Sequence, residues 1–260
     1  MKRVIIGLIM VAATVGLWLG LGAPEAAADG CPPDSVRSGT GCIDKYEASV
    51  WDLSLVSPPF KKALLVLKIK LGTATEAGLL AAGAVQRGVS TNDYGAGCPD
   101  TGNGCKEFYA VSIPGVTPSA FLTWFQAAAA ARNSGKGLPS NAEWQAAALG
   151  TPDGAPCNVS SFSVADTGTA GCASDVGARD MVGNLWEWVA DWVPQSTHCP
   201  GWGGFSDDLM CLTGASTTSG PGALIRGGGF FYGAFAGVFA VDGDITPSSA
   251  GFHIGFRAAR

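Results

Sequence analysis

The stretch Arg179–Trp192 reads RDMVGNLWEWVADW and is the most distinctive text in the chain. Its tryptophans, at positions 186, 188 and 192, combine the two-residue period of a strand with the irregular spacing of a turn. The Gly-Asn pair at 183–184 is a turn signal in front of the first tryptophan. We therefore expect a turn that leads into a tryptophan-rich strand.

Two carboxylates flank this turn, Asp180 before it and Glu187 after it. Carboxylates and main-chain carbonyls are the oxygen ligands that calcium prefers, so the pattern is compatible with a calcium site. The simpler interpretation is structural: Asp180 caps a turn, and Glu187 pairs with an arginine beside a tryptophan core. Chemistry alone favours the structural interpretation.

Composition limits the class of protein. The chain has 260 residues, only 14% of them charged, and 38 glycines, which is typical of a loop-rich globular protein of one large or two small domains. The net charge of -5 offers no basic surface for nucleic acid, so we expect no nucleic-acid partner.

Two helices are predicted among short strands. In the first, Thr117 is the expected N-cap of residues 117–137, and Gly135 or Gly137 the expected end. In the second, Ser140 and Glu143 form a capping box. Residues 41–51 indicate a strand, and residues 58–89 are helical in part, with no role assigned. The class expected is α+β.

The N-terminus has the layout of a secretory signal peptide. Lys2 and Arg3 precede an apolar run, and Ala26–Ala28 supplies small residues for cleavage near Ala28. The alternative is an uncleaved membrane anchor. We expect an exported protein (periplasmic, cell-surface or secreted) with a mature domain over residues 29–260.

Eight cysteines follow the leader and form four local pairs. An exported chain with an even number of cysteines predicts disulfides, whereas a zinc site would require C-x-x-C spacing, which is absent. The pairs expected are Cys31–Cys42, Cys98–Cys105, Cys157–Cys172 and Cys199–Cys211.

Four motifs in order, LPSNAEWQAAALG, DMVGNLWEWVADW, LIRGGGF and GFRAAR, resemble the formylglycine-generating enzyme (sulfatase-modifying factor) family over residues 42–260. The resemblance implies a single domain of the C-type-lectin-like kind. It also implies structural calcium, bound by the Asp180 and Glu187 side chains and the Gly183 and Leu185 carbonyls, with Asp180 standing where the enzymes carry Asn. A second calcium site would fall near Asn158 and Val159.

The family's oxidase chemistry is not expected here. The resemblance implies two copper-binding cysteines between the RGG and FR motifs, but residues 227–256 contain no cysteine, so no copper is expected. A related iron branch needs three histidines, and this chain has only His198 and His253. An oxidase relative with altered chemistry is the alternative function, and an envelope protein without a specific ligand is a third.

The C-terminal segment, residues 226–260, also resembles the variable region of proteins diversified by retroelements. AGVFA at 236–240, PS at 247–248 and IGFR at 254–257 stand in that order. Such retroelements randomise AAC codons to NNC, and residues 230–253 include no Lys, Glu, Gln, Met or Trp, the residues that NNC cannot encode.

This resemblance predicts a ligand-binding protein with a variable C-terminal face. The partner expected is a variable protein or a cell-surface ligand, and membrane contact is expected only through an uncleaved leader. Phe239 and Phe256 lie in the fixed text and are expected in the core. The residues expected to contact ligand are Phe231, Tyr232, Phe235, Asp242, Asp244, Ile245, Ser249, Gly251, Phe252 and His253.

Overall fold

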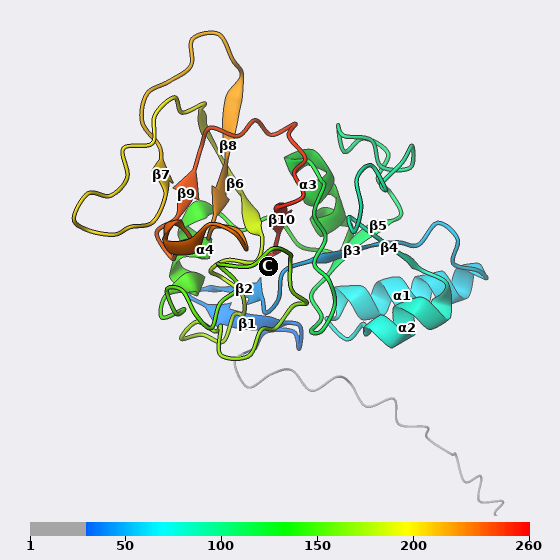
Figure 1. The fold of residues 1–260 in the computed structure, drawn as a ribbon. Coiled ribbons are helices and arrows are strands. Elements are labelled where there is room, and N and C mark those ends of the chain that lie inside the picture. The colour runs from blue at the N-terminus through cyan, green and yellow to red at the C-terminus, as the bar shows by residue number, and fades with distance from the viewer. Residues whose placement is uncertain (1–29) are drawn as a thin grey trace, which may run out of the picture.

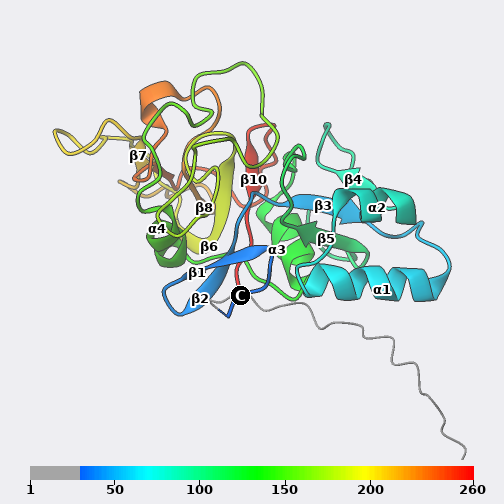
Figure 2. The same ribbon diagram turned by 90° about the horizontal axis from the view of Figure 1, so that it is seen from below.

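The computed structural model describes residues 30–260, so the predicted leader and its cleavage at Ala28 lie outside the described residues. Small sheets and helices are joined by long loops, and both views place α1 and α2 at the end of the molecule away from β7 and β8 (Figures 1 and 2). The α+β class is confirmed. The described helices are α1 (Pro59–Lys70), α2 (Glu76–Ala82), α3 (Trp124–Asn133) and α4 (Asn141–Ala148).

Three sheets carry the described strands, in the orders β10-β6-β8-β9-β7, β4-β3-β5 and β1-β2. Their bounds are β1 (Ser35–Ser38), β2 (Gly41–Asp44), β3 (Ser49–Asp52), β4 (Val85–Arg87), β5 (Phe108–Val111), β6 (Trp186–Pro194), β7 (Met210–Cys211), β8 (Pro221–Arg226), β9 (Val241–Asp242) and β10 (Ile254–Phe256).

The tryptophan motif forms β6, the second strand of the five-stranded sheet. Trp186 is opposite Ile254 of the parallel strand β10, and Trp188 is opposite Ile225 of the antiparallel strand β8. Because side chains alternate across a strand, Trp186 and Trp188 share one face and Glu187 lies on the other. Both tryptophans are fully buried, so β6 is part of the core as well as of the sheet.

The second predicted helix is confirmed and the first begins later than expected. Ser140 and Glu143 form the predicted capping box of α4. In α3 the N-cap is Thr123, whose side chain accepts from the Gln126 N–H, and not Thr117. Phe121 has a φ of 55°, which interrupts a helix that would have started at Thr117.

The segment without an assigned role contains two helices, α1 and α2, which confirms that residues 58–89 are helical in part and adds to the two helices expected elsewhere. Thr75 caps α2 by accepting the Gly78 N–H, a signal that the sequence carried. The strand expected over residues 41–51 is divided into β2 and β3. No helix within residues 30–260 is long and apolar enough to cross a membrane.

All four predicted disulfides are confirmed: Cys31–Cys42, Cys98–Cys105, Cys157–Cys172 and Cys199–Cys211. Each joins cysteines 7 to 15 positions apart, and together they use all eight cysteines of the chain. Disulfides at this density are typical of proteins in an oxidising compartment.

The C-terminus is bonded to the N-terminal hairpin. The Cys42 N–H donates to the Arg260 carbonyl, and the Asp44 N–H donates to the Ala258 carbonyl. Beside this seam, the fully buried ammonium of Lys136 lies 2.6 Å from Asp44 and 2.5 Å from Asp34. Hydrogen bonds therefore hold the last residues of the chain in place, and these residues anchor the C-terminal end of the segment 226–260.

Candidate binding face

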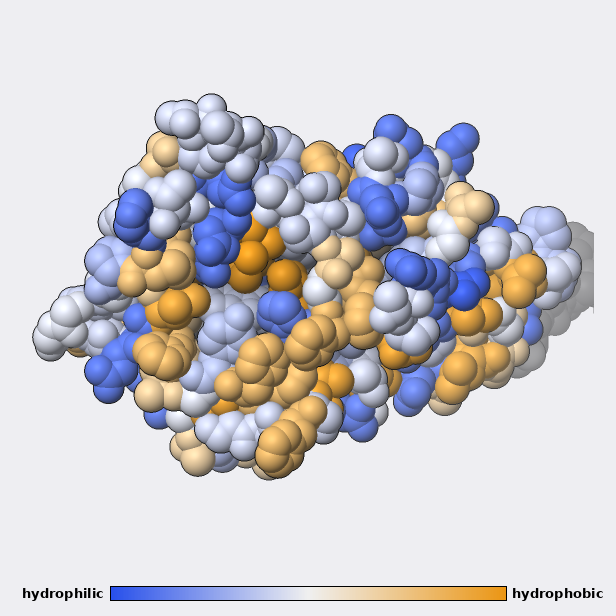
Figure 3. All heavy atoms as spheres, turned by 45° about the horizontal axis from the view of Figure 1, so that its top comes forward, coloured by the Kyte–Doolittle hydropathy of each residue, from blue (hydrophilic) through white to orange (hydrophobic). Residues whose placement is uncertain are grey.

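Four of the predicted contact residues form one cluster, which we call the aromatic face: Phe231, Tyr232, Phe252 and His253. Phe231 and Phe252 are stacked with ring centroids 5.7 Å apart and an interplanar angle of 18°. Their side chains are 46% and 51% exposed, which is unusual for adjacent phenylalanines. The side of the molecule in Figure 3 is hollowed and carries orange hydrophobic residues next to blue hydrophilic ones.

Buried neighbours hold the backbone of this face. Phe230 is 5% exposed, its N–H donates to the Asn184 carbonyl, and its own carbonyl accepts from the Ser161 N–H. On the other side, the Trp186 N–H donates to the His253 carbonyl. The main chain is therefore fixed on both sides of the cluster, while the rings project from it.

Tyr232 connects the face to the core. Its ring meets the edge of the fully buried Trp186 at a centroid distance of 5.2 Å, and it lies 4.9 Å from the Phe231 ring. Burial raises the pKa of the Tyr232 hydroxyl, and the nearby carboxylates of Asp242 and Asp244 raise it further. Tyr232 therefore combines a packed ring with a polar atom next to an acidic pair.

Among the predicted contact residues, Asp242 is the one whose position agrees least with ligand contact, because it is buried. It is 8% exposed in β9, opposite Ile225 of β8, and one of its oxygens accepts the Asp244 N–H at 2.8 Å. Burial and the Asp244 charge raise the pKa of Asp242 to about 7. The partly exposed Asp244 is the better placed of the two for contact.

The other predicted contact residues surround the face. Phe235, at the end of a short 3-10 helix, is 58% exposed. Phe256 is fully buried, which confirms its place in the core, whereas Phe239 is partly exposed and its ring is 4.9 Å from Phe205. The remaining residues are partly exposed: Ile245, Ser249 and Gly251.

Besides a cavity of about 330 Å³ that Phe235 lines together with Trp202 and Asp208, two further cavities border the C-terminal segment. One, of about 400 Å³, is lined by Gly233 and Ala234 together with the acidic residues Asp153 and Asp207. The other, of about 210 Å³, is lined by Ala250 and by residues of the Asn92–Gln126 region, including Phe121. The sequence could not indicate these neighbours, because they come from distant loops that only the fold brings to the segment.

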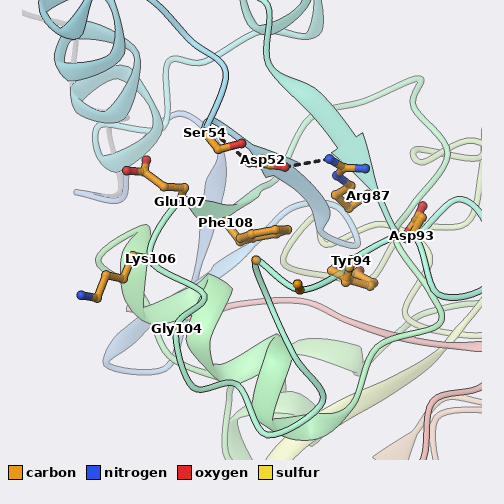
Figure 4. A pocket seen from close by; sticks show the side chains of 12 residues that line it. Asp52, Ser54, Arg87, Asp93, Tyr94, Gly104, Lys106, Glu107 and Phe108 are labelled. Atoms are coloured by element: carbon orange, nitrogen blue, oxygen red, sulfur yellow. Dashed lines mark hydrogen bonds and ion pairs between the residues drawn. The ribbon is translucent and has the colours of Figure 1, made fainter.

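A further cavity, of about 480 Å³, lies near β3, β4 and β5, away from the C-terminal segment (Figure 4). Four of its charged side chains have partners of their own, among them Glu107, which pairs with Lys62. Arg87 donates to Asp52 at 2.8 Å, and Asp93 accepts the N–H groups of residues 88–90. No residue that the sequence predicted as functional lines this cavity, so we do not assign it the binding role.

The predicted calcium residues have other partners. The two Glu187 oxygens accept from Arg257 at 2.6 and 2.7 Å, and the Trp144 indole N–H donates to one of them at 2.7 Å. Asp180 accepts the N–H groups of Gly168 and Thr169. This is the turn cap and buried ion pair of the structural interpretation.

Glu47 completes this buried cluster and was missed from the sequence. Its carboxylate accepts the Leu185 N–H at 2.9 Å and the Asn184 side chain at 2.5 Å. Burial raises the pKa of Glu47 well above its usual range, and the charges of Asp180 and Glu187 raise it further. Its partners are more than 130 positions away in the sequence, so no local signal identified it.

These residues do not fit a calcium ion as they are arranged. The Arg257 guanidinium already faces both oxygens of Glu187. Burial alone would lower the pKa of Arg257, but the nearby carboxylates outweigh it and raise that pKa. Within residues 30–260, no group of three or more His, Cys, Asp or Glu side chains is placed to hold a metal. No function is therefore derived through calcium, and the second site near Asn158 and Val159 stays a prediction.

Comparisons with known proteins agree with the motif resemblance. Residues 158–260 match the family model described as the sulfatase-modifying factor enzyme 1-like domain. The formylglycine-generating enzyme of Thermomonospora curvata is 29% identical over 171 residues, which are 55% of this chain and 55% of that protein. The chain thus spans about half the length of this curated relative.

Two solved structures align with most of the chain at low sequence identity. The Major Tropism Determinant I1 variant is 20% identical at a TM-score of 0.48, covering 88% of this chain and 52% of that one. PvdO from Pseudomonas aeruginosa is 18% identical at a TM-score of 0.45, covering 85% of this chain and 80% of that one.

Proposed function

We propose that this chain, whose residues 158–260 match the sulfatase-modifying factor enzyme 1-like domain, is an exported ligand-binding protein that contacts its ligand through the aromatic face. The observation that carries the proposal is the pair of stacked, half-exposed rings of Phe231 and Phe252. Exposed aromatic rings leave apolar surface in water, and a ligand that covers them recovers that free energy.

The neighbouring groups give this surface both apolar and polar contacts. Tyr232 offers a hydroxyl and His253 an imidazole, and burial lowers the pKa of His253, which favours its neutral form at pH 7. Large aromatic side chains with few rotatable bonds give much contact area at low entropic cost, as in antibody paratopes. A protein or cell-surface ligand suits such a face better than a small ion does.

We further propose that the exposed residues of the C-terminal segment are diversified by a retroelement. The NNC-compatible composition of residues 230–253 supports this proposal. The division between a fixed main chain and projecting side chains supports it too, because such side chains change without loss of buried contacts. The four disulfides would hold the scaffold rigid while the surface varies.

The alternative is a formylglycine-generating-type oxidase with altered chemistry, which the names of the curated relatives favour. The copper site that the family resemblance implies uses thiolates, which copper(I) favours, and every cysteine of this chain is paired in a disulfide. Incubation of the purified chain with copper(I) and a cysteine-containing peptide tests this alternative. Formation of a peptide aldehyde would support it.

A library experiment tests the binding proposal. Codons 231, 232, 252 and 253 are randomised to NNC in the displayed chain, and a control library randomises the buried positions Phe230, Ile254 and Phe256. We expect most members of the first library to fold, and selection on a probe protein such as lysozyme to yield binders. Most members of the control library should be lost.

Equal loss of folded protein from both libraries would contradict the proposal. Failure to select binders from a well-folded first library, against several unrelated probe proteins, would contradict it as well. Binders whose contacts map outside the aromatic face would move the ligand site elsewhere on the molecule.

A further inference from the structure

Helix α1 presents an apolar stripe to solvent. Phe60, Leu64, Leu67 and Leu71 recur at intervals of four, three and four residues, which places them on one side of a helix. Their side chains are 76%, 53%, 51% and 42% exposed. Four large apolar residues in a row on one exposed face are a contiguous patch, unlike the single exposed leucines that soluble proteins commonly carry.

The opposite side of the same helix makes the contacts that fold it. Leu65 and Ile69 are 5% and 1% exposed and pack into a core cluster with α2 and β5. Burial of this second stripe accounts for the stability of α1. The exposed stripe is therefore not needed to fold the helix, and nothing in residues 30–260 covers it.

Lysines flank the exposed stripe. α1 contains four lysines and no acidic residue, in a chain whose net charge is -5. At 100° per residue, the exposed Lys68 and Lys70 fall on either side of the stripe. On the buried side, Lys61 donates to the Ala81 carbonyl at 3.0 Å and Lys62 lies 3.3 Å from Glu107.

We propose that this face of α1 docks on an anionic phospholipid surface. An apolar stripe between lysines is the pattern of a helix that lies in the plane of a membrane interface, with its apolar side chains among the acyl chains and its lysines at the headgroups. A second copy of the chain is a poorer occupant, because two such faces would bring their lysines together. The inference is independent of the proposed function.

The position of α1 suits this role. α1 and α2 form one end of the molecule, and β7 lies at the other end in both views (Figures 1 and 2). Hydrophobic residues at the α1–α2 end alternate with hydrophilic ones (Figure 3). Docking through α1 would leave the C-terminal segment free to meet a ligand, and it adds a membrane contact that does not require the leader.

Flotation of the chain expected after cleavage, residues 29–260, with vesicles tests the proposal. The vesicles contain phosphatidylglycerol and phosphatidylcholine, with vesicles of phosphatidylcholine alone for comparison. The Leu64→Gln/Leu67→Gln variant should lower partitioning to the anionic vesicles at least about tenfold, because two apolar side chains are removed from the contact. The Lys68→Gln/Lys70→Gln variant should lower it roughly tenfold or more at low salt.

The matched control is Leu149→Gln, which changes a leucine of similar exposure, 66%, outside α1. Wild type and variants all lack the apolar leader, so flotation reports on α1 and not on the leader. Equal flotation of the wild-type chain and the Leu64→Gln/Leu67→Gln variant would overturn the proposal. So would equal binding to both kinds of vesicle, or an α1-dependent dimer in solution that does not bind vesicles.

Discussion

The two ends of the C-terminal segment contrast with its middle. Arg226 and Arg257, at the ends, are 3% and 0% exposed, whereas Phe231 and Phe252, between them, are 46% and 51% exposed. In most proteins arginine is at the surface and phenylalanine is inside. The reversal shows that the two arginines hold the fold and that Phe231 and Phe252 are available for contact.

Both arginines gather around one tryptophan. The Arg226 guanidinium lies 4.7 Å from the centroid of the Trp144 ring and donates to the Ala240 carbonyl at 2.7 Å. Arg257 pairs with Glu187, which also accepts the Trp144 indole N–H. Three helix and strand elements thus meet at Trp144, and main-chain carbonyls of residues 238–240 complete the Arg226 contacts, whereas the side chains of the aromatic face take no part in them.

Breaking the Arg257 pair should give the largest effect. Arg257→Leu leaves the buried carboxylates of Glu187, Glu47 and Asp180 without their cation, and loss of one partner of a buried pair costs about 3–5 kcal/mol. Urea unfolding with the disulfides intact measures the change. Arg132→Leu, at an exposed position of α3, is the control and should alter the unfolding free energy by less than about 0.5 kcal/mol. A decrease in unfolding free energy of less than about 1 kcal/mol for Arg257→Leu would contradict the structural role of the buried arginines.

A pair of phenylalanines sharpens the contrast. Phe256 is fully buried, so Phe256→Ala should lower the unfolding free energy by about 3–5 kcal/mol. Phe252→Ala, four positions earlier, should lower it by less than about 1 kcal/mol, because half of that side chain is already in water. Similar losses in the two variants would mean that the aromatic face is part of the core.

Asp242 should make the folded protein sensitive to pH. The pKa of Asp242 is about 7 in the folded chain and near 3.8 in the unfolded chain. The folded state therefore holds this proton more tightly, so the contribution of Asp242 to the unfolding free energy is greatest at acid pH and is lost as pH rises toward 7. One such group changes the unfolding free energy by at most about 1.4 kcal/mol per pH unit. Asp242→Asn should flatten the pH dependence between about 4 and 7, measured by urea unfolding at several pH values. A slope equal to the wild-type slope would show that Asp242 is ionised in the folded state.

Calcium should have the smallest effect. Because Arg257 already faces Glu187, chelation or addition of calcium is expected to leave the melting temperature unchanged. Thermal unfolding with EDTA and with millimolar calcium measures this. A calcium-dependent rise that disappears in Glu187→Gln would restore the site implied by the family resemblance.

Local features of the fold could be predicted from the sequence, and distant contacts could not. The four disulfides and the Ser140–Glu143 capping box join residues close in the chain, so spacing and turn chemistry sufficed. The start of α3 was missed because Thr117-Pro118 is also a good helix start, and the left-handed conformation of Phe121 cannot be read from its identity.

The candidate site shows the same division. The exposure of Phe231 and Phe252 followed from their place between fixed motifs, whereas the burial of Asp242 depends on its pairing with β8. Glu47 and the cavity residues Asp153 and Asp207 come from distant parts of the chain. The sequence therefore predicted that residues between the fixed motifs are exposed, but the contacts that bury Arg226 and Arg257 could be found only in the structure.

The most direct test of a variable face is made on DNA. We would sequence the end of the gene and the few kilobases beyond it. The account predicts an imperfect repeat of codons 227–257 beside a reverse transcriptase, with adenines in the repeat opposite the codons of exposed residues such as Phe231 and Phe252. It also predicts matched codons for the buried Phe256 and Arg257. An intact locus without a repeat or a reverse transcriptase, or a repeat that varies at the buried positions, would contradict it.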